Sequence, residues 1–364
     1  MATDIRPAAP SGPAGTRPAS TWGQDLVTVL LATWLVVGVF VDGWAHNNLA
    51  SLETFFTPWH ALFYSGFLAT ALWVLRVVTR HLNARPAGQP WTAAVPAGYG
   101  LGLAGLVVFA VGGAADTVWH TLLGVEVSIP ALLSPPHLTL LAGASLVVTS
   151  PLRAAWARPG TAPGFRRLLP ALLSLTLLTC QAAFFFQYVS PWEYVYVTSG
   201  YDNRVLYLES LGVDYDFRVV GQILGIMGIL FTGLLLLAPL LYLLRRWRLP
   251  FGAATLLVTL VAALSSAILE FEFPELVAAA LAGGLLADLL IARLRPGPEP
   301  GRRGAFVITA ALVPVAIWGS HMLAAGLVRG MGWPAELSFG VVAMASLCGL
   351  VLGLLMAPVD SPHG

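Results

Sequence analysis

Aspartate and histidine recur at a fixed spacing in the first part of the chain. Residues 42–46 read Asp-Gly-Trp-Ala-His and residues 116–120 read Asp-Thr-Val-Trp-His, so both segments have an Asp-x3-His pattern. A further histidine follows each segment, His60 after Thr-Pro-Trp and His137 after Ser-Pro-Pro. The repeated pattern supplies six side chains, which are Asp42, His46, His60, Asp116, His120 and His137.

These side chains have the chemistry of a transition-metal site. On a helix, residues i and i+4 lie on one face, so the aspartate and histidine of each segment project together. A hairpin then returns the second histidine to the same level. Each unit thus offers two imidazoles and one carboxylate, which suit copper, iron or zinc and leave positions open for water, dioxygen or substrate. The two units make two separate sites or one binuclear site.

Five other side chains are candidates for additional ligands. One acid lies between the halves of each unit, two more flank a predicted turn between apolar segments, and one histidine lies in a late apolar segment. These residues are Glu53, Glu126, Glu270, Glu275 and His321.

The chain that carries these residues is too apolar for water. Of its 364 residues, 57% are hydrophobic and only 10% are charged, and the mean hydropathy is +0.78. Soluble domains carry about 25% charged residues, so this composition excludes a cytosolic enzyme and a nucleic-acid-binding protein. It predicts a chain that lies in a lipid bilayer.

Apolar runs of about 20 residues predict an all-α, polytopic transmembrane helix bundle with about ten spans. The expected spans are 24–45, 58–79, 96–122, 135–152, 168–188, 218–244, 250–270, 274–294, 305–328 and 335–357. The first four contain the duplicated helix hairpin that carries the Asp/His pattern.

Three regions follow from this reading. Residues 1–21 are expected to be a disordered cytoplasmic tail, since they are rich in Pro, Ala, Gly and Ser. Residues 22–152 form a four-helix membrane unit, and residues 153–364 form a six-helix membrane unit. Within the second unit, residues 189–217 are expected to be an outer loop whose aromatic side chains lie at the headgroup level, cover the metal site or contact a partner.

The arginines predict the orientation. With a cytoplasmic N-terminus, all but three of the 19 basic residues fall on the cytoplasmic side, and the exceptions are Arg204, Arg218 and Arg329. This bias predicts a multi-pass plasma-membrane protein with the Asp/His pattern near the outer face. Asp288 is the only acid that we expect in the inner halves of the helices, as a structural partner.

A structural interpretation of the Asp/His pattern is also open. An aspartate four residues before a histidine can orient the ring, or exchange a proton with it, without any metal. We favour the metal because ionisable residues inside membrane helices are costly and usually functional.

The pattern resembles the C subunit of the particulate methane and ammonia monooxygenase family, the copper membrane monooxygenases. In that family, an Asp-x3-His-x12-His set binds copper in the membrane and an Asn-x3-His-x13-His set supplies a second site nearby. The resemblance covers residues 42–143, with thirteen residues between His46 and His60, sixteen between His120 and His137, and Asp116 in place of the family's Asn. It implies copper as the cofactor and a monooxygenase activity.

The leading hypothesis is an integral membrane metalloprotein with a mono- or dinuclear site, with copper favoured and iron and zinc as alternatives. It would act as an oxygenase-like redox subunit on a small or lipid-soluble substrate. The expected partners are the lipid bilayer, other membrane subunits, or a periplasmic or extracellular redox partner, and no nucleic acid.

The alternative from another class is a non-catalytic membrane metal carrier, transporter or metal-insertion factor. A transporter needs a polar path through the bundle, and Asp288 alone does not provide one. A third reading is haem held by two histidines between helices.

Overall fold

The computed structural model describes residues 17–49, 56–124, 128–210 and 216–358. These residues are helical, and the only β pairing among them is one isolated bridge between Thr198 and Met331. Two short 3-10 helices, Trp91–Ala94 and Gln187–Val189, lie in connections. The α-helices are α1 (Trp22–Asn48), α2 (Pro58–Asn83), α3 (Gly100–Leu123), α4 (Ser128–Leu133), α5 (Pro135–Val148), α6 (Ser150–Trp156), α7 (Phe165–Phe185), α8 (Ser199–Ser210), α9 (Phe217–Leu244), α10 (Ala253–Ala267), α11 (Pro274–Leu294), α12 (Arg303–Arg329) and α13 (Ala335–Met356).

Nine spans in the described part of the chain are long and apolar enough to cross a membrane. They are α1, α2, α3, α5 with α6, α7, α9, α11, α12 and α13. The remaining expected span, 250–270, is α10, whose 15 residues extend about 23 Å against a hydrocarbon core of about 30 Å. The protein is therefore a polytopic helical bundle.

Local sequence explains where the first helices begin. The Thr21 side chain accepts a hydrogen bond from the backbone N–H of Gln24, whose side chain accepts one from the Thr21 N–H, so α1 starts at a capping box. The Thr57 side chain caps α2 by accepting a hydrogen bond from the backbone N–H of His60, and Pro58 is at the first helical position. These caps fix the ends of the helices on which the candidate ligands lie.

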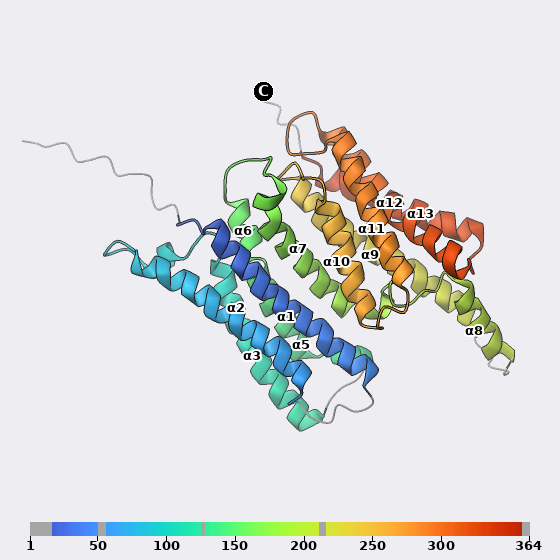
Figure 1. Cartoon of the computed structure of the whole chain (residues 1–364), viewed down its shortest axis with the longest axis horizontal. Coiled ribbons are helices and arrows are strands. Elements are labelled where there is room, and N and C mark those ends of the chain that lie inside the picture. Colours follow the sequence, from blue (N-terminus) through green and yellow to red (C-terminus); the bar gives the residue numbers. More distant parts are fainter. Residues whose placement is uncertain (1–16, 50–55, 125–127, 211–215, 359–364) are drawn as a thin grey trace, which may run out of the picture.

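The helices form two groups on either side of α7. In Figure 1, α1, α2, α3 and α5 lie together on one side and α9 to α13 lie on the other. Helix α7 contacts α1 and α5 as well as α9 and α10, and it is the most buried of the spanning helices. The largest apolar core accordingly joins side chains of α1, α7, α9, α10 and α12.

Within the first group, α1 packs on α2 and α3 packs on α5 through glycines. A Cβ atom added to Gly66 would lie 2.6 Å from the backbone nitrogen of Leu35, and one added to Gly143 would lie 2.5 Å from that of Phe109. No side chain fits at such distances, so both glycines are needed for the close approach of the helix backbones.

Some features differ from the sequence expectations. Residues 199–210, expected in a loop, form α8. The span 135–152 is interrupted at Thr149, where α5 ends and α6 begins. Residues 1–16 of the expected tail lie outside the described residues, but Ser20 is buried against the bundle.

The expectation that Asp288 is the only acid in the inner halves of the helices is wrong, because Asp25 is fully buried near the start of α1. Arg158 Nη2 lies 2.5 Å from Oδ2 of Asp25. Oδ1 of Asp25 accepts hydrogen bonds from the hydroxyls of Ser20 and Tyr99, both at 2.8 Å. The Asp288 carboxylate has a structural role, because it accepts hydrogen bonds from the first backbone N–H groups of α10.

Candidate metal centre

The six residues of the repeated pattern lie at one end of the bundle. Each Asp-x3-His segment forms the C-terminal end of a helix, α1 or α3, and each second histidine lies in the first turn of the helix packed against it, α2 or α5. The structure thus brings together Asp42, His46 and His60 in one set and Asp116, His120 and His137 in another.

The Asp116 set is compact, and its carboxylate is buried. Oδ1 of Asp116 lies 3.2 Å from Nε2 of His120 and 3.0 Å from Nε2 of His137. The Asp116 side chain is only 1% exposed. Ligand atoms about 2.1 Å from a tetrahedral ion are about 3.4 Å from one another, so these separations are close to the edges of a coordination shell.

The ring orientation of the two histidines supports a cation at this place. Nδ1 of His120 lies 3.2 Å from the backbone oxygen of Gly124, and Nδ1 of His137 contacts the backbone oxygen of Ala131. A carbonyl can only accept, so in each ring Nδ1 carries the proton and Nε2 of the neutral ring presents a lone pair. Two lone pairs directed at the Asp116 carboxylate are stable only if a metal ion or additional protons lie between them.

The Asp42 set has the same arrangement but is wider. Oδ2 of Asp42 lies 3.8 Å from Nε2 of His46 and 3.6 Å from Nε2 of His60. Thr57 Oγ1 lies 3.1 Å from Nδ1 of His60 and orients that ring. The other carboxylate oxygen of Asp42 is buried and has no hydrogen-bond partner among the described residues. A buried carboxylate oxygen without a partner is costly, and a bound cation would satisfy it.

The two sets are neighbours. The rings of His60 and His120, one from each set, have centroids 6.1 Å apart. The hydroxyl of Tyr64, on α2 with His60, donates a 2.9 Å hydrogen bond to Oδ2 of Asp116 on α3. The geometry therefore suits two metal ions held side by side.

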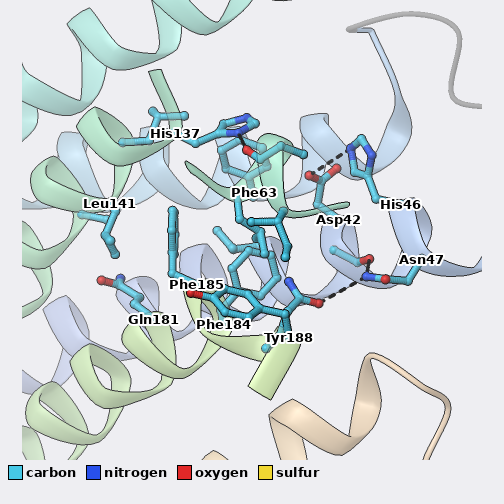
Figure 2. A pocket seen from close by; sticks show the side chains of 18 of the residues that line it. Asp42, His46, Asn47, Phe63, His137, Leu141, Gln181, Phe184, Phe185 and Tyr188 are labelled. Atoms are coloured by element: carbon cyan, nitrogen blue, oxygen red, sulfur yellow. Dashed lines mark hydrogen bonds and ion pairs between the residues drawn. The ribbon is translucent and has the colours of Figure 1, made fainter. Parts of the chain in front are cut away.

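A cavity of about 320 Å³ adjoins both sets. Figure 2 shows Asp42, His46 and His137 on one side of it and residues of α7 on the other. Most of its wall is apolar and aromatic, and its remaining polar groups are amides and phenols of Asn47, Gln181, Gln187, Tyr188 and Tyr194. Among the described residues, no arginine or lysine lines it, so Asp42 has neither of these side chains in the cavity to balance its charge.

The second half of the chain holds the end of α1 in place. The Asn48 amide donates to the backbone oxygen of Ile268 at 2.8 Å, and the Asn47 amide donates to the Gln187 side chain at 3.3 Å. These contacts fix the turn that carries His46. Residues 153–364 therefore contribute both support and one wall of the cavity.

The three additional candidate ligands that the structure describes do not join the two sets. Glu270 accepts a 3.2 Å hydrogen bond from Trp44, which lies between Asp42 and His46 in the sequence. Glu275 pairs with Arg329 at 2.6 Å. His321 is buried in α12 beside Trp318 and does not line the cavity. Glu53 and Glu126 lie outside the described residues.

Sequence reasoning missed the residues that complete the site. Tyr64 and the wall residues Gln181, Phe184 and Phe185 were not among the candidates. Tyr64 had a detectable signal, because it lies four residues after His60 and so on the same helix face. The α7 residues had none, since only the folded chain brings α7 to the hairpins.

Comparisons of the chain with protein-family models, curated proteins and solved structures find no match. The two Asp/His sets and the cavity beside them are therefore the features of this chain that indicate a function.

Proposed function

We propose that this membrane protein holds two copper ions, one in each Asp/His set, and acts as an oxygenase-like redox subunit on a small, lipid-soluble substrate. The observation that carries the proposal is the convergence of two imidazole Nε2 atoms on one carboxylate, twice, beside an apolar cavity. Two protein nitrogens and one oxygen leave coordination positions open on each ion.

Copper is proposed over iron and zinc because the spacing of the six residues resembles that of the copper membrane monooxygenases. Two imidazoles and one carboxylate also suit iron, and zinc accepts the same donors. The metal content of the protein distinguishes these ions directly.

We further propose that the two hairpins are an internal duplication. In each set, the glycine six residues after the second histidine contacts the residue seven before the aspartate. These contacts are Gly66 against Leu35 and Gly143 against Phe109, and they support one shared register. A second pair of contacts also has equal offsets in the two hairpins. The glycine four residues before the aspartate contacts the residue three after the second histidine, Gly38 against Phe63 and Gly112 against Leu140. Equal offsets at four contacts are expected if both hairpins were built on one plan.

The residues around the site suit an apolar substrate. The side chains of Phe63, Phe109, Phe184 and Phe185 line the cavity, exclude water and offer contact to a hydrocarbon surface. Bound copper would supply dioxygen activation, and the insertion of one oxygen atom into a C–H bond requires two electrons and two protons that release the other atom as water. An external redox protein would donate these electrons at the face that carries the site, which we propose is the outer face.

A metal transporter is the second candidate, and it has less support. Translocation needs ligands at both ends of the bundle, but the described residues contain only the two Asp/His sets, both at one end. At the other end, the buried acid Asp25 is already paired with Arg158.

The proposal is tested by metal analysis of the detergent-purified full-length protein after reconstitution with copper. Wild type is expected to retain about two equivalents of copper, and the His46→Ala/His120→Ala double variant is expected to lose both. His81→Ala is the matched control, because His81 lies at the opposite end of α2 and should leave the copper content unchanged. Oxygen-dependent oxidation of short alkanes by the copper-loaded protein, supplied with a reductant, would support the redox role.

Retention of zinc or iron instead of copper would overturn the assignment of the metal. If wild type retains no transition metal after copper, iron and zinc are offered in turn, the Asp/His sets are structural or exchange protons, and the oxygenase proposal fails.

A further inference from the structure

We infer that the two metal centres are unequal: the Asp116 set holds its ion more tightly, through a carboxylate that lies outside the cavity wall, and the Asp42 set is the exchangeable centre at which a small exogenous ligand binds. Tyr64 is the positioning residue that creates the difference. This inference rests on the proposed function, since it requires that both sets bind metal.

The two hairpins carry different side chains at one equivalent position near the ligands. Tyr64 lies four residues after His60, and the residue four after His137 is Leu141. Both side chains are on the helix that carries the second histidine of its set. The phenol is thus present in one hairpin and replaced by an alkyl group in the other, and Figure 2 shows Leu141 at the cavity wall.

The carboxylate oxygens of the two sets have different hydrogen-bond partners. The Tyr64 hydroxyl donates to Oδ2 of Asp116 at 2.9 Å, which leaves Oδ1 to face both imidazoles of that set. Asp116 therefore binds an ion through one fixed oxygen. The Asp42 carboxylate receives no hydrogen bond at Oδ1 from any described residue, so this oxygen is available to change its mode of coordination. A carboxylate held by an additional hydrogen bond gives a more rigid ligand and a tighter site.

The two carboxylates differ in their access from the cavity. Both histidines of each set line the cavity, but only one of the two carboxylates does. Asp42 is 15% exposed and is part of the cavity wall, whereas the Asp116 side chain is 1% exposed and is not. The nitrogen–oxygen separations are also longer in the Asp42 set, 3.6 and 3.8 Å against 3.0 and 3.2 Å. A molecule that enters the cavity therefore reaches all three ligands of the Asp42 set, but only the two histidines of the Asp116 set.

The experiment is a copper(II) titration of the metal-free, full-length protein against a competing chelator, followed by addition of azide as the probe ligand. Wild type is expected to show two classes of copper that differ at least tenfold in affinity, and azide should change the electron paramagnetic resonance signal of the weaker class only. Asp42→Ala should remove the weaker class together with the response to azide, and Asp116→Ala should remove the tighter class.

Tyr64→Phe tests the cause of the difference. It keeps the ring and removes the hydroxyl, so the tighter class should weaken about tenfold or more while the weaker class and its azide response stay as in wild type. Tyr242→Phe removes a hydroxyl from a tyrosine of α9 that stacks on Trp156 and does not line the cavity, and it should change neither class. A purely structural effect of Tyr64→Phe would weaken both classes together.

The outcomes separate the two proposals. Two classes of equal affinity, an equal response of both to azide, or equal weakening by Tyr64→Phe would overturn the inequality and leave the binuclear site intact. Absence of copper binding by wild type would instead overturn the proposed function. If Tyr64→Phe does not fold, the Asp42→Ala and Asp116→Ala titrations still test the inequality.

Discussion

The Thr57 side chain has two roles at the entrance to the Asp42 set. Its oxygen accepts a hydrogen bond from the His60 backbone N–H and lies 3.1 Å from Nδ1 of the His60 ring. At the equivalent place in the second hairpin, Ser134 precedes α5 but makes no capping hydrogen bond, and its hydroxyl is buried without a partner among the described residues. The two positions have similar sequences but different functions.

Thr57→Ala should therefore weaken both the fold and the metal centre. Loss of the cap is expected to cost about 1 kcal/mol of stability, and loss of the contact to the His60 ring should lower copper affinity of the Asp42 set roughly tenfold. Ser134→Ala is the matched control, and it should be neutral or slightly stabilising. Thermal unfolding in detergent and the copper titration measure the two effects. Equal destabilisation by both variants would contradict this account of the caps.

Burial of Glu193 is expected to make the stability of the protein depend on pH. The residue is only 3% exposed in the connection between α7 and α8, and burial raises the pKa of its carboxyl from 4.5 to about 9. Between pH 4.5 and 9 the unfolded chain loses this proton while the folded chain keeps it, so the contribution of Glu193 to stability falls as the pH rises through this window. The loss is up to about 1.4 kcal/mol per pH unit.

Glu193→Gln should remove this dependence, because the amide stays neutral. The variant is expected to unfold at a higher temperature than wild type at pH 8, with a smaller difference at pH 5. Melting curves of both proteins at the two pH values provide the measurement. A difference that grows as the pH falls would show that Glu193 is ionised in the folded protein.

At the residue scale, spacing revealed the six candidate ligands but not the groups that hold them. Asp42 and His46 are four apart on one helix, so their proximity follows from helix geometry alone. The contact of Tyr64 with Asp116 joins different hairpins, and its existence depends on how α2 packs beside α3. No spacing within one segment contains that information.

At the scale of helices, the distance between ligands depends on how closely paired helices approach. Gly143 lies six residues after His137, where the α3 backbone passes next to α5. A methyl group at this position would lie 2.5 Å from the backbone nitrogen of Phe109, so the two helices must separate to admit it. The separation would move His137 away from Asp116.

Gly143→Ala should therefore destabilise the protein by about 1 to 3 kcal/mol and reduce binding of the tighter copper. Gly340→Ala provides the control, because nothing lies within 4 Å of the added atom on exposed helix α13. The control should be neutral or slightly stabilising, since alanine favours a helix over glycine by up to about 1 kcal/mol. Unfolding and copper content are measured for both variants, and normal copper retention by Gly143→Ala would contradict a role of helix spacing in the centre.

Helix type and number could be predicted because apolar runs of sufficient length have few alternatives in a bilayer. The ends of helices were less predictable. Helix α10 begins where the Asp288 carboxylate of α11 accepts hydrogen bonds from the backbone N–H groups of Ala254 and Thr255, and that contact joins two separate segments. Helix α8 carries several charged side chains and lacks the apolar run on which the search for spans relied.

At the scale of the whole molecule, the two ends of the bundle have separate chemistry. Asp25 and Asp42 lie on the same helix, 17 positions or about 25 Å apart. The end with Asp42 carries the candidate metal ligands, whereas the end with Asp25 carries an ion pair to Arg158 that joins the segment after α6 to α1. Between them, the packing of α1, α2, α3 and α5 consists of apolar side chains such as Leu35, Phe63 and Phe109.

The separation predicts that the ion pair affects folding but not metal binding. Arg158→Ala leaves the fully buried Asp25 carboxylate without its cation, which should cost about 3 kcal/mol. Arg166→Ala is a fitting control, because Arg166 lies over the ring of Trp22 at the same end without a buried acid as partner, and it should cost less than about 1 kcal/mol. The folded fraction of Arg158→Ala, isolated by size-exclusion chromatography, should retain the wild-type amount of copper with both affinities unchanged. This result is expected because apolar packing separates the two ends. If the folded variant contained less copper per molecule than wild type, the ion pair and the metal centre would be coupled through α1.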